Sequence, residues 1–171
     1  MALYVHVGSL PRPQPLVDLL VKKDHGEPYD HAALDREARK AVMDIVAHQV
    51  ATGIDVVSDG EASKIGYATY IKDRLTGFGG EPFVPKPQRD LADYPGFRER
   101  MVQFTGPQVF RRLCCIGDIK LSDHDAVKQD VANLKAAMAA SKPVDAFMPA
   151  ASPGVVSAFQ PNRHYPTHAA Y

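Results

Sequence analysis

The sequence predicts an α/β protein built on a parallel β-sheet. Short apolar segments rich in β-branched residues begin near positions 3, 54, 113 and 145, and amphipathic helical segments alternate with them. Small polar turns follow the first, second and fourth segments, which is typical of strands that end at the ligand-binding edge of a parallel sheet. A closed (β/α)8 TIM barrel takes about 250 residues. The 171 residues therefore predict a TIM-barrel-like half barrel of about four strand–helix units.

The composition predicts one globular domain over residues 1–171 and excludes several classes of partner. Lys plus Arg equals Asp plus Glu at 20 each, so no overall positive charge attracts nucleic acid or an anionic membrane. No apolar run approaches the roughly 20 residues of a membrane span, and the N-terminus lacks the pattern of a secretory signal. The two cysteines, Cys114 and Cys115, are adjacent and cannot cross-link distant segments. We expect a reducing, cytoplasmic location.

The first strand–helix unit is expected to begin with a strand over 3–7. The turn 8–13 follows, with a glycine, a serine and two prolines, and functions either as a ligand-binding turn or as an ordinary strand-to-helix connection. A short helix is expected over 15–23. A longer helix is expected over 30–52, because apolar residues recur at helical spacing, Asp30 or Asp35 can cap its start, and Gly53 can end it.

The second strand is expected over 54–57, and it ends in three polar residues, Ser58, Asp59 and Glu61, with Gly60 allowing the backbone to turn. Carboxylates at the carboxyl end of a parallel strand can bind a cationic group. The other interpretation is that both acids cap the next helix, which we expect over 64–75. Tyr67 and Tyr70 share one face of that helix, where they would line a pocket or belong to the core.

The second half of the chain continues the alternation less regularly. Residues 81–96 are proline-rich and predict an irregular loop. A third strand is expected over 113–119, followed by a helix that Ser122 caps and that ends near Ser141. The fourth strand is expected over 145–150, and Ser152 lies in the small polar turn 151–154 that follows it.

Several of these segments together resemble the cobalamin-independent methionine synthase family, in the catalytic C-terminal barrel and the shorter single-barrel relatives. The resemblance is carried by VGSLPRP at 7–13, GIDVVSDGE at 53–61 and YATYIKDRLTGF at 67–78, and more weakly by CIGD at 115–118 and FMPAASPG at 147–154. It implies zinc-dependent transfer of a methyl group from a methylated folate to the thiol of homocysteine, in which zinc holds the thiol as a nucleophilic thiolate.

The resemblance also implies roles for residues of two turns. Val7, Gly8 and Ser9 would bind the carboxylate of the thiol amino acid, and Glu61 would pair with its ammonium group. Asp59, Tyr67 and Ser152 are further candidates for the same pocket. We therefore expect the turn after the first strand and the turn after the second strand to meet at one edge of the sheet.

The zinc ligands of the family are a His-x-Cys pair, a Glu and a further Cys, and these 171 residues contain no His-x-Cys spacing. We therefore assign no catalytic residue, and we expect this chain alone to hold no zinc and to have no methyltransferase activity. Four interpretations stay open. They are a truncated enzyme, half of a split enzyme completed by a partner chain, a self-associating non-catalytic module, and a relative that alkylates another thiol such as coenzyme M.

Overall fold

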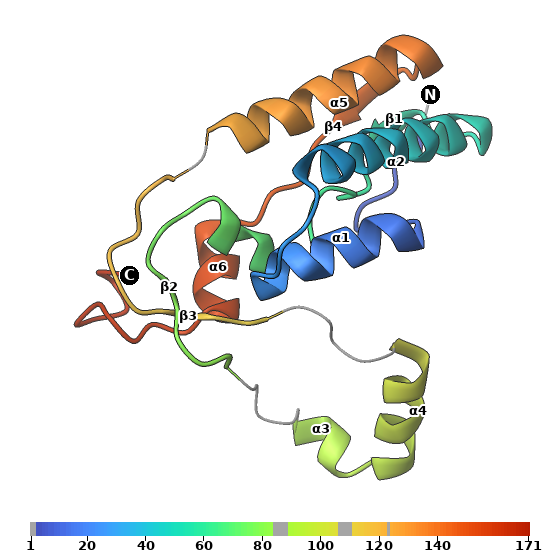
Figure 1. Cartoon of the computed structure of the whole chain (residues 1–171). Helices are drawn as coiled ribbons and strands as arrows, with labels where there is room; N and C mark the ends of the chain where they lie inside the picture. The colour runs from blue at the N-terminus through green and yellow to red at the C-terminus, as the bar shows by residue number, and fades with distance from the viewer. Residues whose placement is uncertain (1–2, 84–88, 106–110, 123) are drawn as a thin grey trace.

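A computed structural model describes residues 3–83, 89–105, 111–122 and 124–171. Helices dominate the fold, and two small sheets lie among them (Figure 1). The α-helices are α1 (Gln14–His25), α2 (His31–Ala51), α3 (Arg89–Ala92), α4 (Pro95–Thr105), α5 (Asp125–Ser141) and α6 (Pro153–Phe159), and a 3₁₀ helix, η1, covers Thr69–Asp73. The strands are β1 (Val56–Ser58), β2 (Phe78–Gly79), β3 (Cys114–Cys115) and β4 (Asp145–Phe147). No helix in the described part is long and apolar enough to cross a membrane.

The parallel sheet confirms the predicted α/β class and is smaller than expected. β1 pairs in parallel with β4, so that Val56 lies opposite Asp145 and Ser58 opposite Phe147. On the other side of β1, the predicted first strand contributes a single parallel bridge, from Val5 to Val56. The described residues therefore place three parallel segments side by side, and they do not show the four-stranded half barrel that we expected.

The predicted third strand, over 113–119, is not part of this sheet. Only Cys114–Cys115 within it form a strand, β3. β3 pairs antiparallel with β2, with Phe78 opposite Cys115. The approach is close at Gly77, which has a φ of 88°, and where an added Cβ would lie 2.6 Å from the backbone oxygen of Gly117. Glycine at position 77 permits this close approach of β2 and the residues after β3, which a sequence pattern of apolar residues does not reveal.

One predicted helix and one predicted cap are wrong, whereas the helices predicted over 15–23, over 30–52 and up to Ser141 form as α1, α2 and α5. Only the 3₁₀ helix η1 forms within the helix predicted over 64–75, because Gly66 and the β-branched residues around it disfavour an α-helix. Ser122 does not cap α5, whose N-cap is His124. In contrast, α2 begins as predicted, with the Asp30 carboxylate accepting the N–H of Ala33, and Gly53 follows its end with a φ of 87°.

The loop predicted over 81–96 is partly helical. Residues 84–88 lie outside the described part, and α3 and α4 follow, packed against each other. Figure 1 shows this helix pair set apart from the body formed by α1, α2 and α5.

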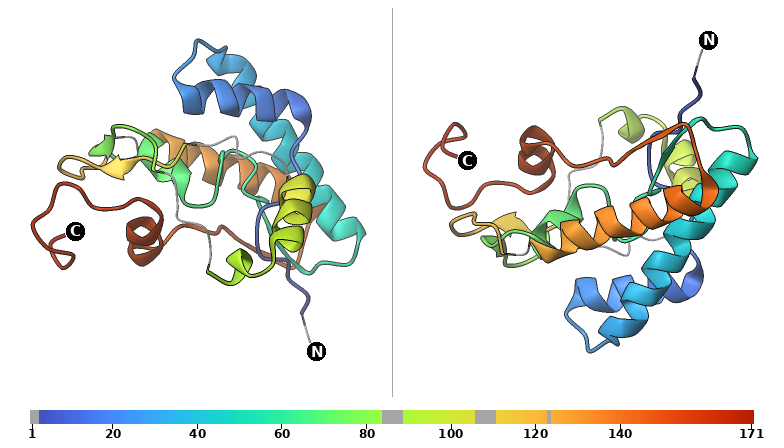
Figure 2. Two further views of the ribbon diagram at one scale, coloured as in Figure 1. Left: turned by 90° about the horizontal axis from the view of Figure 1, so that it is seen from below. Right: turned by 90° about the horizontal axis from the view of Figure 1, so that it is seen from above.

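The hydrophobic core lies where α2 packs against α1, α5 and β1. α2 contacts both neighbouring helices, and the views in Figure 2 show α5 crossing it. The apolar face of α2 meets Leu16 and Leu20 of α1, Val57 of β1, and Leu134 and Ala137 of α5. Val57 of β1 belongs to this core, and the candidate site begins where β1 ends, one residue later.

Candidate functional site

Two turns meet at the carboxyl edge of the parallel sheet. The hydroxyl of Ser9, in the turn after the first strand, donates a hydrogen bond of 2.5 Å to Oε2 of Glu61, 52 residues later. Ser9 is exposed, whereas Glu61 is only 2% exposed. The expected meeting of the two turns is therefore confirmed, and it places a buried carboxylate next to a reachable hydroxyl at the edge where α/β proteins bind ligands.

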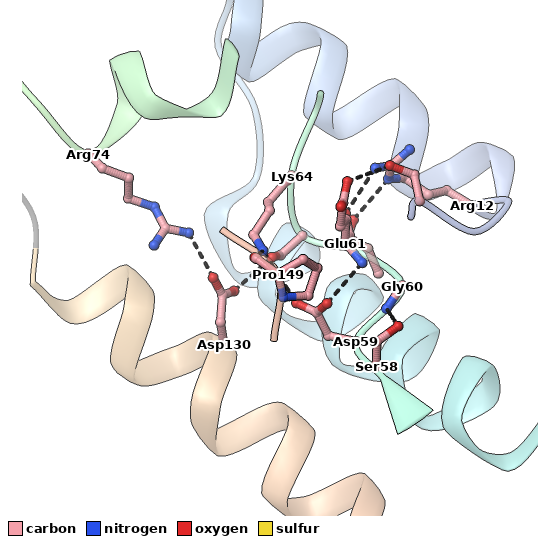
Figure 3. Close-up of polar contacts among 12 residues, drawn as sticks. Arg12, Ser58, Asp59, Gly60, Glu61, Lys64, Arg74, Asp130 and Pro149 are labelled. Atoms are coloured by element: carbon pink, nitrogen blue, oxygen red, sulfur yellow. Dashed lines mark hydrogen bonds and ion pairs between the residues drawn. The ribbon is translucent and has the colours of Figure 1, made fainter. Parts of the chain in front are cut away.

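The turn after β1 holds Glu61 in an uncommon backbone conformation. Gly60 has a φ of 59° and Glu61 has a φ of 56°, so both are left-handed. The backbone N–H of Gly60 donates to the Ser58 hydroxyl at 3.3 Å, and that of Glu61 donates to Oδ1 of Asp59 at 3.0 Å (Figure 3). A non-glycine residue in this region is uncommon, and such outliers concentrate at functional sites.

Arg12 fastens the two turns together. Its guanidinium donates hydrogen bonds to the backbone oxygens of Glu61, at 2.9 Å, and Ala62, at 3.3 Å. The N–H of Leu10 adds a third contact, to the oxygen of Gly60 at 3.0 Å. No sequence pattern predicts a role for Arg12, because its partners are backbone oxygens. The one sequence feature that could have indicated a role for Arg12 is its position between two prolines, in a turn that follows a strand.

Lys64 connects the turn after β1 to the turn after β4. Its ammonium lies 3.6 Å from Oδ2 of Asp59 and donates a hydrogen bond of 2.9 Å to the backbone oxygen of Pro149. Burial raises the pKa of Asp59, and the attraction of Lys64 lowers it in part. Sequence reasoning also missed Lys64, since its role depends on where β4 ends in space.

A second set of polar contacts joins the segment after Glu61 to α5. Asp130 of α5 accepts hydrogen bonds from the Ser63 hydroxyl at 2.7 Å and from Arg74 at 2.8 Å (Figure 3). The ring of Tyr70 lies between these groups, with Lys64 at 5.3 Å and Arg74 at 5.5 Å from its centroid. These contacts attach the short segment 61–74 firmly to α5, although no α-helix forms in it.

The structure brings together some of the predicted site residues. Ser9 and Glu61 are hydrogen-bonded, and Asp59 accepts the backbone N–H of Glu61 within the same turn. The interpretation that Asp59 and Glu61 cap a following helix is wrong, because no α-helix follows this turn. Gly8 has a φ of 118° and open space where a side chain would point, and Val7 is exposed.

Tyr67 and Ser152 do not take part in the contact between Ser9 and Glu61. Tyr67 is 43% exposed, and the Ser152 hydroxyl caps α6 by accepting the N–H of Val155 at 3.2 Å. Among the described residues, no hydrogen bond joins either side chain to Ser9 or Glu61.

Zinc does not fit the residues that the structure describes. In the ranges given above, no group of three or more His, Cys, Asp or Glu side chains is arranged to hold a metal ion. Cys114 and Cys115 are both fully buried in β3, within the small antiparallel sheet. We therefore derive no chemical step through zinc, and the expectation that this chain alone holds none stays a prediction.

Comparison with known proteins supports the fold. No protein-family model matches the sequence, and no curated protein matches it. A solved structure does, a B12-independent methionine synthase from Shewanella sp. W3-18-1 in complex with selenomethionine, with a TM-score of 0.66 and 19% sequence identity. The fold of this chain is similar to that of part of this methionine synthase. The similarity covers 96% of this chain and 42% of the methionine synthase chain, so this chain spans less than half of that protein.

Proposed function

We propose that these residues form the amino-acid-binding part of a methionine-synthase-like methyltransferase. In this proposal the ammonium group of a homocysteine-like thiol amino acid replaces the Ser9 hydroxyl as the partner of Glu61. The freed hydroxyl of Ser9, with the backbone at Val7 and Gly8, then binds the carboxylate of the amino acid. The observation that carries the proposal is the hydrogen bond from Ser9 to Glu61, because it joins the two turns from which such a pocket would be built. The fold shared with part of a methionine synthase supports the same substrate class.

The charge of the site favours an amino acid over other thiols. Glu61 is a buried carboxylate, and the described residues give its Oε2 one partner, the neutral hydroxyl of Ser9. The cation beside it, Arg12, donates to backbone oxygens of the turn. An ammonium group supplies the charge-assisted hydrogen bonds that such a carboxylate accepts well. A thiol that carries only an anionic group, such as coenzyme M, would meet repulsion there.

The methyl-transfer step is not assigned to residues of this chain. The described residues offer no metal-binding group, and the 171 residues contain no His-x-Cys spacing. We propose that the chain alone binds the acceptor amino acid without transferring a methyl group to it. Remaining strands and ligands would come from further βα units, whether of the same polypeptide or of a partner.

Isothermal titration of the 171-residue chain with L-homocysteine tests the proposal. We expect Glu61→Gln to weaken binding by about 10- to 100-fold, since a hydrogen bond to a charged group contributes about 1.5–3 kcal/mol. The amide oxygen can still accept the Ser9 hydroxyl, so folding should persist. Glu27→Gln is the matched control, because Glu27 is 57% exposed and distant in sequence from both turns.

A ligand without the amino group sharpens this test. The affinity for 4-mercaptobutanoate, which keeps the thiol and the carboxylate, should not fall in Glu61→Gln and should rise, because the substitution removes the repulsion between two carboxylates. Equal losses for both ligands would show that the substitution acts on the fold and would refute the assigned pairing. Failure of the native chain to bind L-homocysteine would refute the proposed function itself.

A further inference from the structure

A glutamine occupies a core position on α2. The buried residues of this helix recur at helical spacing through Ala38, Val42 and Val46, and Gln49 continues the series at 4% exposure. An apolar side chain is the usual occupant of such a position. A polar side chain there is unfavourable unless all of its hydrogen-bonding groups find partners.

The side-chain amide of Gln49 forms hydrogen bonds with both backbone groups of one residue, Ser58. Its Nε2 donates to the Ser58 oxygen at 2.8 Å, and its Oε1 accepts the Ser58 N–H at 3.0 Å. A further contact of Nε2, to the oxygen of Ile45, measures 3.3 Å. Because an amide presents one acceptor and its donors at the spacing of a peptide group, Gln49 pairs with Ser58 as a residue of a neighbouring strand would.

The position of this pair in the sheet explains why a substitute is needed. The N–H of Val56 donates to the oxygen of Tyr4 in the first strand, at 3.1 Å. Ser58 lies two residues further along β1, so its peptide groups point to the same side of the strand. Among the described residues, no backbone hydrogen bond joins the first strand to Ser58, although Leu10 N–H meets the next turn at the Gly60 oxygen. The Gln49 amide replaces the missing strand neighbour at the last residue of β1.

The turn that presents Glu61 starts at Ser58. The next residues form two local hydrogen bonds and then place Gly60 and Glu61 in the left-handed region, which is unfavourable for Glu61. Such a conformation persists only where the surrounding structure fixes it. We infer that Gln49 is a positioning residue, which fixes the Ser58 peptide so that the following turn delivers the Glu61 carboxylate to Ser9. Its effect on ligand binding rests on the function proposed above.

Gln49→Glu tests this inference because the pH controls its hydrogen bonding. An ionised carboxylate can accept the Ser58 N–H and repels the Ser58 oxygen, whereas a protonated carboxyl donates and accepts as the amide does. Burial next to a carbonyl oxygen raises the pKa of such a glutamate. The proton is therefore bound more tightly in the folded chain, and the native pairing returns as the pH falls below the pKa of the new carboxyl group.

Amide hydrogen exchange followed by NMR, corrected for intrinsic rates, provides the readout. We expect Gln49→Glu at pH 7 and Gln49→Leu to lower the protection of Ser58 and also of Glu61 by at least about 10-fold, the size of one lost buried hydrogen bond. In Gln49→Glu, both should recover near pH 5 to the values of the native chain at that pH. The native chain corrects for Asp59, which accepts the Glu61 N–H and whose pKa burial raises. Gln14→Glu, the same change at an exposed position of α1, should alter neither amide.

The result at Glu61 decides the inference. Loss of protection at Ser58 alone, with Glu61 unchanged, would show that Gln49 only supports the end of β1 and would overturn it. If Gln49→Leu fails to fold, the pH titration of Gln49→Glu gives the same decision within one protein. The native chain's affinity for L-homocysteine is measured separately, so a chain that does not bind it refutes the proposed function and leaves the exchange test of Gln49 intact.

Discussion

Lys64 and Asp59 form an ion pair that is almost completely buried, with side chains 4% and 3% exposed and 3.6 Å between Nζ and Oδ2. The ammonium also donates to the oxygen of Pro149, after β4. The pair is therefore both an electrostatic contact and the connection between the ends of two parallel strands. Its geometry leads to two predictions about stability.

Lys64→Met is expected to lower the free energy of unfolding by about 3–5 kcal/mol, because breaking a buried ion pair leaves an uncompensated charge in the interior. Urea unfolding at pH 7 measures the change. Lys128→Met is the control, since Lys128 and Asp125 form a pair whose side chains are 72% and 89% exposed. An exposed pair contributes less than about 1 kcal/mol. Similar losses in the two variants would contradict the importance of the buried pair.

The loss caused by Lys64→Met should shrink in acid. Burial raises the pKa of Asp59 above its usual value, so the folded state binds this proton more tightly than the unfolded chain does. In Lys64→Met at pH 7, the charge of Asp59 is buried without a partner and lowers the free energy of unfolding. Asp59 becomes neutral as the pH falls through its raised pKa toward the unfolded value of about 3.9, and this loss then disappears. Unfolding at pH 7 and near pH 4.5 checks this. The double variant with Asp59→Asn should show no such recovery.

Gly60→Ala should destabilise the chain by about 1–3 kcal/mol through strain and crowding together. Gly60 has a φ of 59°, and an added Cβ would lie 3.0 Å from a methyl carbon of Ile45 and 3.1 Å from Leu10. Gly96→Ala is the opposite case, because Gly96 lies in α4 with nothing within 4 Å of an added Cβ. That variant should gain up to about 1 kcal/mol from helix propensity. Thermal unfolding of both variants gives the comparison.

The adjacent cysteines should react only when the structure opens. Cys114 and Cys115 are 0% exposed, and burial raises the pKa of the Cys115 thiol, which lowers its thiolate fraction at pH 7. We expect a disulfide reagent to label them at least about 100-fold more slowly than in urea, with a rate set by local opening. Ile116→Cys, at a neighbouring position that is 49% exposed, should react at once. Rapid labelling of the native chain would show that β3 is not buried as described.

The features that the sequence predicted well are local ones. The helix α2 is 21 residues long, so its apolar repeat and its Asp30 cap identify it clearly. The meeting of Ser9 and Glu61 was predictable because the carboxyl ends of parallel strands share one edge. The helix predicted over 64–75 was wrong because Gly66 and tertiary contacts outweigh a stripe of aromatic residues.

The features that the sequence did not reveal depend on backbone partners far along the chain. Arg12 and Lys64 bind carbonyl oxygens, and every residue has one, so no pattern marks the right one. The strand β3 has only two residues, both apolar, so the sequence does not tell which sheet it joins. Its pairing with β2 depends on backbone contacts, among them the hydrogen bonds from Ile116 and Gly117 to the oxygen of Gly77. Gln49 is the exception, because a polar residue in the series of buried positions on α2 is visible in the sequence.

The contact between Ser9 and Glu61 also links recognition to the order of assembly. The two residues belong to different strand–helix units, and neither unit alone contains both halves of the proposed pocket. A small molecule that contacts both turns would bind only after the two units have docked. Its free energy of binding would therefore stabilise the docked arrangement of the units. Ligand binding would then show whether the N-terminal strand–helix unit is docked. Variants in which the first strand is destabilised would lose affinity for the ligand before they lose their helices.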